Sequence, residues 1–222
     1  ICAVVFLHVW ALHVTGSNNP LGIEPKGKQD TIPFHPYYTM KDSFGVLVFL
    51  IIYAFFVFYL PNALGHPDNY IPADPLVTPS HIVPEWYFLP FYAILRAITF
   101  DIGIPFTSIV LIPAKLGGVL AMFGSIAILF VLPFIDKHPI RSAFYRPWYK
   151  IFLLVFVATV VILGVCGGKP AEGFWVPLSQ LCTFYYFAFF ILVIPFLNKK
   201  EPVAKLPPSI NDAVLLKNKA KS

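Results

Sequence analysis

Two histidines, His8 and His13, lie in the apolar segment that opens the sequence. Ionisable side chains inside a membrane segment are costly and usually face a protein interior. Neutral imidazole is a common metal ligand, including for haem iron, so His8 is interpreted either as a ligand or as a packing residue bonded to a neighbouring helix. The pair is about 140° apart on a helix, so one metal cannot easily bind both. His13, just before helix-ending glycine and proline, could line an interfacial polar pocket, snorkel or cap the helix.

Lys41 and Asp42 stand where the next apolar run begins. A carboxylate near a helix N-terminus is commonly a cap or complements the helix dipole. A lysine, a carboxylate and a histidine on one membrane side could instead deliver protons to a redox ligand. Both interpretations stay open on these residues alone.

Glu85 is the most unusual carboxylate, because it follows Pro84 and precedes aromatic residues that include Tyr87 and Phe88. Apolar surroundings favour the protonated form of a carboxylic acid, which suits proton acceptance near neutral pH. A structural role, with the carboxylate accepting bonds from backbone amides, is the alternative. Tyr92 could donate a hydrogen bond to a carbonyl or pack as an interfacial aromatic.

The composition indicates a membrane protein. Of 222 residues, 58% are hydrophobic and 12% charged, and mean hydropathy is +0.74, whereas soluble domains carry about 25% charged residues. The net charge of +5 does not indicate nucleic-acid binding, since the basic residues lie between apolar runs and in the tail. The three cysteines form no CxxC pair, and we expect them to be packing residues without chemical function. The sequence starts inside an apolar run, so we expect further residues upstream.

Four stretches reach the roughly 20 apolar residues that a transmembrane helix needs. They are residues 44–63, 117–135, 148–168 and 174–197, preceded by a half-span at 1–14. We therefore expect an all-α integral membrane protein with four full transmembrane helices plus the second half of an N-terminal one.

Basic residues predict the topology, since lysine and arginine favour the inner side. If the loop before residue 44 is inside, thirteen of the 16 basic residues lie inside, and only Arg96, Lys115 and Lys169 lie outside. The outer loop, residues 61–116, is long enough to suggest a function. We expect a short helix in it after Glu85, and an apolar or amphipathic insertion at 99–113.

Several motifs resemble the cytochrome b family, and the resemblance covers nearly the whole chain. They are LHVTGSNNP at 12–20, FHPYYTMKD at 34–42, GHPDNYIPADPLVTP at 65–79, PEWY at 84–87 and KLGGV at 115–119. The resemblance implies two parts: residues 1–43, with the end of a haem-binding helix and the inner quinone-site loop, and residues 44–222, a helical domain with the quinol-oxidation loop.

The resemblance also implies residue roles. His8 would be an axial ligand of one haem b and the metal-binding residue. The inner quinone-reduction pocket would contain His13, Ser17, Lys41 and Asp42, of which His13 and Asp42 would move protons. The outer quinol-oxidation pocket would contain Pro84, Glu85, Tyr87, Phe88 and Tyr92, with Glu85 and Tyr87 as its catalytic residues.

The implied function is that of a ubiquinol–cytochrome c oxidoreductase subunit working by a Q cycle. Ubiquinol would be oxidised at the outer site. One electron would pass to an iron–sulfur (Rieske) protein and a cytochrome c-type subunit, and the other would pass through two b haems to quinone at the inner site. This electron transfer would be coupled to proton translocation. A homodimeric complex is implied too. The family's first helices and the other haem ligands are absent from this sequence, so the N-terminal half of a cytochrome b is an expected partner. The insertion at 99–113 resembles bacterial forms, which favours a bacterial plasma membrane over a mitochondrial inner membrane.

Two other functions compete with the redox subunit. A transporter or channel would show polar or glycine- and proline-interrupted spans in paired positions, but the four full spans are nearly free of charge. A structural remnant that had lost its chemistry would be expected to lack His8 or Glu85, and both are present.

Overall fold

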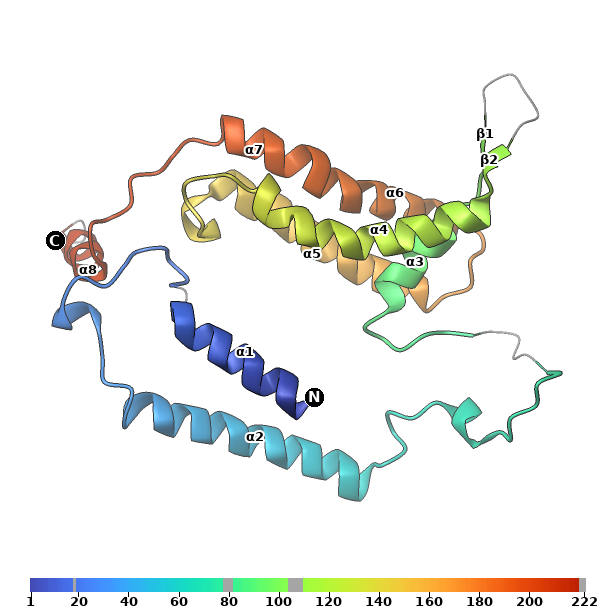
Figure 1. The fold of residues 1–222 in the computed structure, drawn as a ribbon, viewed down its shortest axis with the longest axis horizontal. Helices are drawn as coiled ribbons and strands as arrows, with labels where there is room; N and C mark the ends of the chain where they lie inside the picture. Colours follow the sequence, from blue (N-terminus) through green and yellow to red (C-terminus); the bar gives the residue numbers. More distant parts are fainter. Residues whose placement is uncertain (18, 78–81, 104–109, 220–222) are drawn as a thin grey trace. The chain divides into compact units, whose positions relative to one another are not determined.

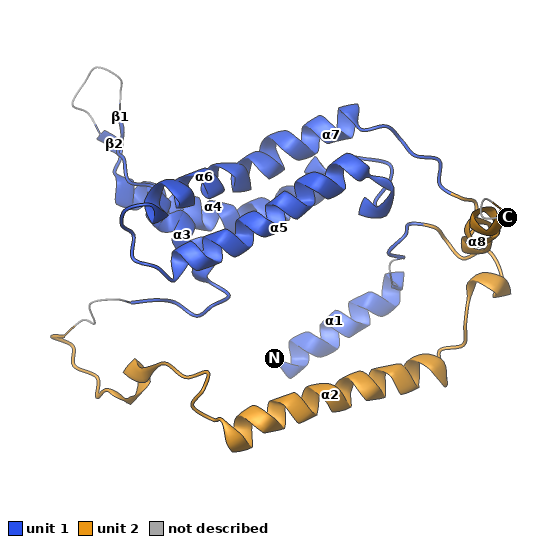
Figure 2. Cartoon of the chain, turned by 180° about the vertical axis from the view of Figure 1, so that it is seen from behind, with its two compact units in different colours: residues 1–22, 80–206 blue, residues 23–79, 207–222 orange. Residues whose placement is uncertain are grey.

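The computed structural model describes residues 1–17, 19–77, 82–103 and 110–219. It divides into two compact units, one of Ile1–Gly22 and Ser80–Leu206 and the other of Ile23–Pro79 and Pro207–Ser222 (Figure 2). Each unit is described by itself below.

Helices make up most of both units (Figure 1). The first unit contains α1 (Cys2–Thr15), α3 (Leu89–Ala97), α4 (Ala114–Ile135), α5 (Pro147–Gly167), α6 (Trp175–Ala188) and α7 (Ile194–Lys200). The second contains α2 (Tyr37–Tyr59) and α8 (Ile210–Lys219). Short 3-10 turns cover Lys28–Asp30, Pro67–Tyr70 and Ala143–Tyr145.

The four predicted spans are confirmed as helices. Among the described residues, four helices are long and apolar enough to cross a membrane: α2, α4, α5 and the continuous stretch Trp175–Lys200. The main difference lies at α2, which begins at Tyr37 and not at residue 44, because polar residues such as Lys41 do not break a helix. The apolar half-span is the continuous helix α1, which Gly16 ends with a φ of +75°.

The short helix expected after Glu85 is α3, and it is the centre of the first unit. It packs against α4, α5 and α6 and buries Ala93, Ile94 and Ala97. Since lipid gives no hydrophobic driving force for helix association in a membrane, packing relies on small residues that let backbones approach. Gly118 and Gly167 do this: a Cβ at either would collide with a backbone carbonyl of α3, at Leu95 or Leu89.

A π-helical turn, Phe189–Val193, joins α6 to α7 within the last span. Pro195 is the second residue of α7. It has no N–H, and in a regular helix its ring would clash with the carbonyl four residues earlier. The wider turn accommodates the proline inside one span. Beyond it, Ile194 and Leu197 are fully buried.

Buried charges tie together one end of the α4–α7 bundle. Arg146 is fully buried: its Nε donates to Glu201 at 3.0 Å and its Nη1 to Asp136 at 3.2 Å. Its guanidinium also lies 4.1 Å from the ring centre of Tyr149. Glu201 accepts the backbone N–H groups of Trp148 and Tyr149, so it also caps the start of α5.

The insertion predicted at 99–113 contains two short antiparallel strands, β1 (Ile102–Gly103) and β2 (Val110–Ile112). Helices still make up most of the protein, as expected, and residues 104–109 lie outside the described residues. Asp101 fixes the base of the strand pair, because its carboxylate accepts the N–H of Ala114 at the start of α4.

The second unit shows less internal burial. The long helix α2 has no buried residue. Asp30 joins α8 to the 3-10 turn, since its carboxylate accepts the N–H groups of Asn211 and Lys26. Thus α2 presents apolar side chains on every face to whatever surrounds this unit.

Candidate functional site

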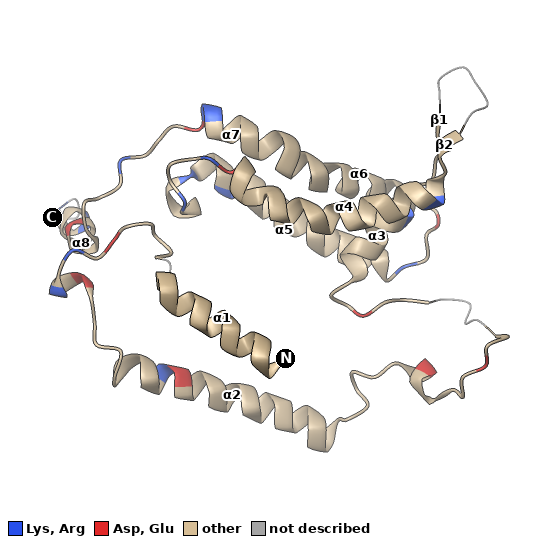
Figure 3. Cartoon of the chain, viewed as in Figure 1, with Lys and Arg blue, Asp and Glu red and all other residues tan. Residues whose placement is uncertain are grey.

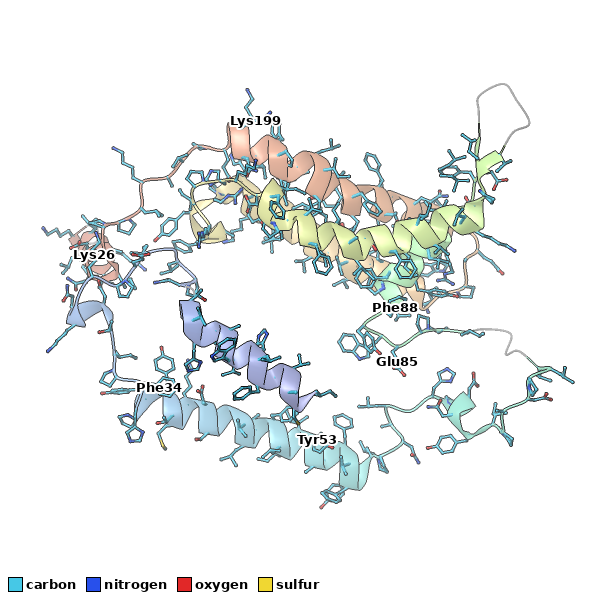
Figure 4. All side chains as sticks on the ribbon, viewed as in Figure 1. Lys26, Phe34, Tyr53, Glu85, Phe88 and Lys199 are labelled. Atoms are coloured by element: carbon cyan, nitrogen blue, oxygen red, sulfur yellow. The ribbon has the colours of Figure 1, made fainter. Side chains whose placement is uncertain are left out.

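The outer-loop residues form a turn that leads directly into α3. The N–H of Phe88 donates to the carbonyl of Glu85 at 2.9 Å, and that of Tyr92 donates to Phe88 at 3.0 Å. Glu85 is therefore an exposed residue just before the start of α3 (Figure 4). The rings of Phe88 and Phe91 lie 5.7 Å apart across the junction.

The Glu85 carboxylate is exposed, as are Trp86 and Tyr87, while Pro84 and Phe88 are partly buried. The apolar enclosure expected for Glu85 is therefore not formed by the described residues. What the turn does provide is an accessible carboxylate beside several aromatic rings. Such an arrangement can accept a proton from a ligand that lies on those rings.

Tyr92 holds the segment that precedes the turn. Its hydroxyl donates to the carbonyl of Ile82 at 3.3 Å, and the guanidinium of Arg96 lies 4.4 Å from its ring centre. Tyr92 thus bonds a carbonyl, as one of its two predicted roles required. Residues 78–81, including the end of the predicted 65–79 motif, lie outside the described residues.

Two residues that sequence reasoning did not assign to the site anchor α3. Arg96 donates from Nη2 to the carbonyls of Cys166, Gly167 and Lys169, at 2.7, 2.9 and 2.9 Å, at the C-terminal end of α5. Gln180 donates to the carbonyl of Ala97, the last residue of α3, at 3.1 Å. A lone arginine within an apolar helix was the available signal, since such a charge needs partners.

In the first unit, α1 presents His8 and His13 on different faces, and both are exposed. His13 donates from Nδ1 to the carbonyl of Val9 at 2.8 Å, so in the neutral ring Nε2 keeps its lone pair. The His8 ring has no partner among the residues that the structure describes. Ser17 follows the helix and is exposed.

In the second unit, Lys41 and Asp42 are exposed on α2. Asp42 is the sixth residue of this helix, beyond the first turn to which a helix-dipole effect is confined. The capping interpretation of Asp42 is therefore wrong. Lys41 Nζ lies 5.9 Å from the ring centre of Tyr38. The inner pocket that would combine His13, Ser17, Lys41 and Asp42 stays a prediction.

Charges within the first unit gather at the helix ends (Figure 3). Arg96, Lys115 and Lys169 lie at the end where α4 begins and α5 stops, whereas Lys199 and Lys200 end α7. Between those ends the helices carry almost only apolar residues. Fold and site together define a helical membrane protein with an exposed carboxylate–aromatic turn in an interhelical loop.

Comparisons with known proteins agree with this class. The family described as cytochrome b (C-terminal)/b6/petD matches residues 72–187. Cytochrome b of Rhodospirillum rubrum is 57% identical over 212 residues, covering 96% of this chain and 49% of that protein. Cytochrome b/c1 of Bradyrhizobium diazoefficiens is 52% identical over 217 residues, covering 98% and 30%.

A solved structure, a hyperthermophilic respiratory complex III, superposes with a TM-score of 0.78 at 33% identity, covering 90% of this chain and 48% of that chain. The chain belongs to the cytochrome b family, and it spans about half the length of its cytochrome b relatives.

Proposed function

We propose that this chain is the quinone-processing C-terminal part of a cytochrome b in a ubiquinol–cytochrome c oxidoreductase, which works by a Q cycle. The observation that carries the proposal is the turn at residues 84–88, where an exposed Glu85 carboxylate precedes a helix anchored at both ends. Family membership supports electron transport as the general function.

At the outer site, Glu85 accepts a proton from the quinol hydroxyl. Tyr87 and Phe88 orient the quinol ring by aromatic contact, and Pro84 and Tyr92 hold the segment that carries them. The anchored helix α3 matters because proton transfer needs heavy atoms within about 2.6–3.2 Å. A carboxylate on a loop without such anchoring would seldom lie within that distance of the quinol hydroxyl.

His8 fits an axial haem ligand. It is an exposed imidazole without a partner among the described residues, on an apolar helix, which leaves a nitrogen lone pair free for iron. Bound b haems would carry electrons across the membrane between the two quinone sites. Another residue that holds this haem would come from the N-terminal half of a cytochrome b.

At the inner site, His13, Ser17, Lys41 and Asp42 bind quinone and supply protons to it. The Nδ1–H of His13 is held by the Val9 carbonyl, so its Nε2 is the atom that exchanges a proton with the quinone. Further expected partners are an iron–sulfur (Rieske) protein, a cytochrome c-type subunit and a second copy of the complex. A bacterial plasma membrane is the favoured location.

The Glu85 role is tested by measuring haem reduction by quinol in the first turnover of the complete complex. Glu85→Gln keeps the shape but cannot accept the proton, so the rate is expected to fall about 100-fold or more. Glu172→Gln, an exposed carboxylate in the α5–α6 connection, is the matched control and keeps the rate. An unchanged rate in Glu85→Gln would refute the proton-acceptor role.

The His8 role is tested by a redox titration of the reduced-minus-oxidised optical spectrum. His8→Leu is expected to remove one of two b-haem signals from the assembled complex. His66→Leu, an exposed histidine in the outer loop, is the control and keeps both. Two normal signals in His8→Leu would remove it as a ligand.

A further inference from the structure

Tyr92 and Arg96 lie four residues apart on α3, and their side chains are in contact. In a helix, side chains four positions apart are neighbours on the same face. The Cζ atom of the Arg96 guanidinium lies 4.4 Å from the centre of the Tyr92 ring. A cation within about 6 Å of an aromatic ring centre is attracted to the face of the ring. The Tyr92 ring therefore has a charged neighbour on its own helix.

The guanidinium that meets this ring is itself held by another helix. Nη2 of Arg96 donates to the carbonyls of Cys166 and Gly167, the last two residues of α5, and to that of Lys169. The last carbonyls of a helix lack partners within the helix, so a cation is stabilised there. Arg96 keeps this position although its Nε is buried and has no hydrogen-bond partner among the described residues, which costs free energy. The end of α5 and the Tyr92 ring together thus set the position of the guanidinium.

The hydroxyl of Tyr92 closes the segment that carries Glu85. It donates to the carbonyl of Ile82 at 3.3 Å, and Glu85 lies between these two residues in the chain. This hydrogen bond is exposed, so water competes for both partners and the bond contributes little by itself. A ring that was free to change its rotamer would lose the bond easily. The contact with Arg96 restrains the ring and keeps the hydroxyl within reach of Ile82.

We propose that Arg96 is a positioning residue for quinol oxidation and that it acts through Tyr92. Arg96 restrains the ring, the hydroxyl holds Ile82, and the closed segment 82–92 keeps the Glu85 carboxylate within reach of the quinol hydroxyl. The inference rests on the proposed function of Glu85. It goes beyond the anchoring of α3, because Gln180 also anchors α3, but through Ala97 and Thr99, at the end of the helix away from Glu85.

The test measures haem reduction by quinol in the first turnover of the complete complex, over a range of quinol concentrations. Arg96→Met should lower the maximal rate about three- to thirtyfold, the range that loss of a cation–ring contact predicts. Tyr92→Phe keeps the ring and removes the hydroxyl, and it should lower the maximal rate about two- to tenfold. In both variants the half-saturating quinol concentration should change less than about twofold, because the defect is in positioning and not in binding.

The double variant tests whether the two residues act together. If Arg96 acts through the Tyr92 hydroxyl, the double variant should be at most about twofold slower than the slower single variant. Gln180→Leu is the matched control, since it removes the other anchor of α3, and its effect on the rate should multiply with that of Tyr92→Phe. If Arg96→Met does not assemble with normal haem spectra, Arg96→Lys takes its place. A lysine ammonium lacks the planar fork that can bond carbonyls and stack on a ring at once.

Effects of Arg96→Met and Tyr92→Phe that multiply would overturn the inference, because Arg96 would then act independently of the Tyr92 hydroxyl. A raised half-saturating concentration at an unchanged maximal rate, or a full maximal rate in Tyr92→Phe, would also overturn it. Glu85→Gln, measured on the same preparation, separates this inference from the proposed function. A normal rate in Glu85→Gln refutes the proposed function, whereas a slow Glu85→Gln with multiplying effects at Arg96 and Tyr92 overturns the role of Arg96 alone.

Discussion

Replacing Arg146 by methionine should destabilise the complex strongly. The side chain of Arg146 is fully buried. It bonds Glu201, whose side chain is also fully buried, and Asp136, whose side chain is 27% exposed. Methionine keeps most of the volume but leaves the Glu201 charge buried without its cation. Removing one partner of a buried pair costs about 3–5 kcal/mol. For a chain of this size that corresponds to a fall in Tm of roughly 6–20 °C.

The assay can use the protein's own thiols. Cys166 and Cys182 are free and buried, so a thiol-reactive fluorophore labels them only as the bundle opens. Cys2 is exposed and would first be replaced by serine to remove background. Heating the detergent-solubilised complete complex at one fixed scan rate gives comparable Tm values, because membrane complexes commonly unfold irreversibly.

Arg141→Met is the matched control, since Arg141 is exposed in the same connection and its Tm should change little. A second comparison isolates the charge pair. Arg146→Met combined with Glu201→Gln should lose less than the sum of the single changes, since contacting partners are coupled. A Tm for Arg146→Met within about 2 °C of the parent protein would refute the reasoning, because that is less than 1 kcal/mol.

Two further changes test how the bundle holds α3, and a third tests the contact between α6 and α4. Gly167→Ala should displace the start of α3 and lower the free energy of unfolding by at least about 1–3 kcal/mol. The control Gly164→Ala, where a Cβ meets only ordinary contacts, should leave Tm unchanged. Equal Tm values for the two variants would contradict the close approach of Gly167 to α3. Arg96→Gln should lower Tm and slow haem reduction by quinol together, since it frees the end of α5; a normal rate would show that this anchor does not position Glu85. Tyr186→Phe should cost about 1 kcal/mol by removing the bond to the Ser125 carbonyl, and an unchanged Tm would argue against that bond.

The spans were predictable because the length of an apolar run alone decides whether a helix can cross a bilayer. The helix starts were less predictable. At α2, an apolar run begins at residue 44, but no glycine or proline lies between Tyr37 and Asp42 to break a helix. The polar residues before the apolar run therefore belong to the same helix. The strand pair around residues 102 and 112 was not predicted, since strands of two and three residues are too short to show an alternating apolar pattern.

The candidate site residues, such as Glu85 and Tyr92, came from the resemblance, and their shared role stays a prediction. The structure adds the turn that follows Glu85 and the bond from Tyr92 to the carbonyl of Ile82. The anchoring by Arg96 and Gln180 depends on contacts across 70 or more positions in the sequence, which no local pattern encodes. The surroundings expected of Glu85 were inferred from neighbours in sequence, and in the structure those neighbours are exposed as well.

The π-helical turn at Phe189–Val193 has a consequence for how the length of this span can vary. Such a turn holds one residue more than a regular α-helical turn, so deleting a single residue there could restore α-helix without breaking the span. Every later side chain would then rotate by about 100° relative to the rest. Leu197 would leave the core, and Glu201 would lose Arg146. The last span is therefore a place where a one-residue deletion preserves secondary structure and destroys tertiary structure.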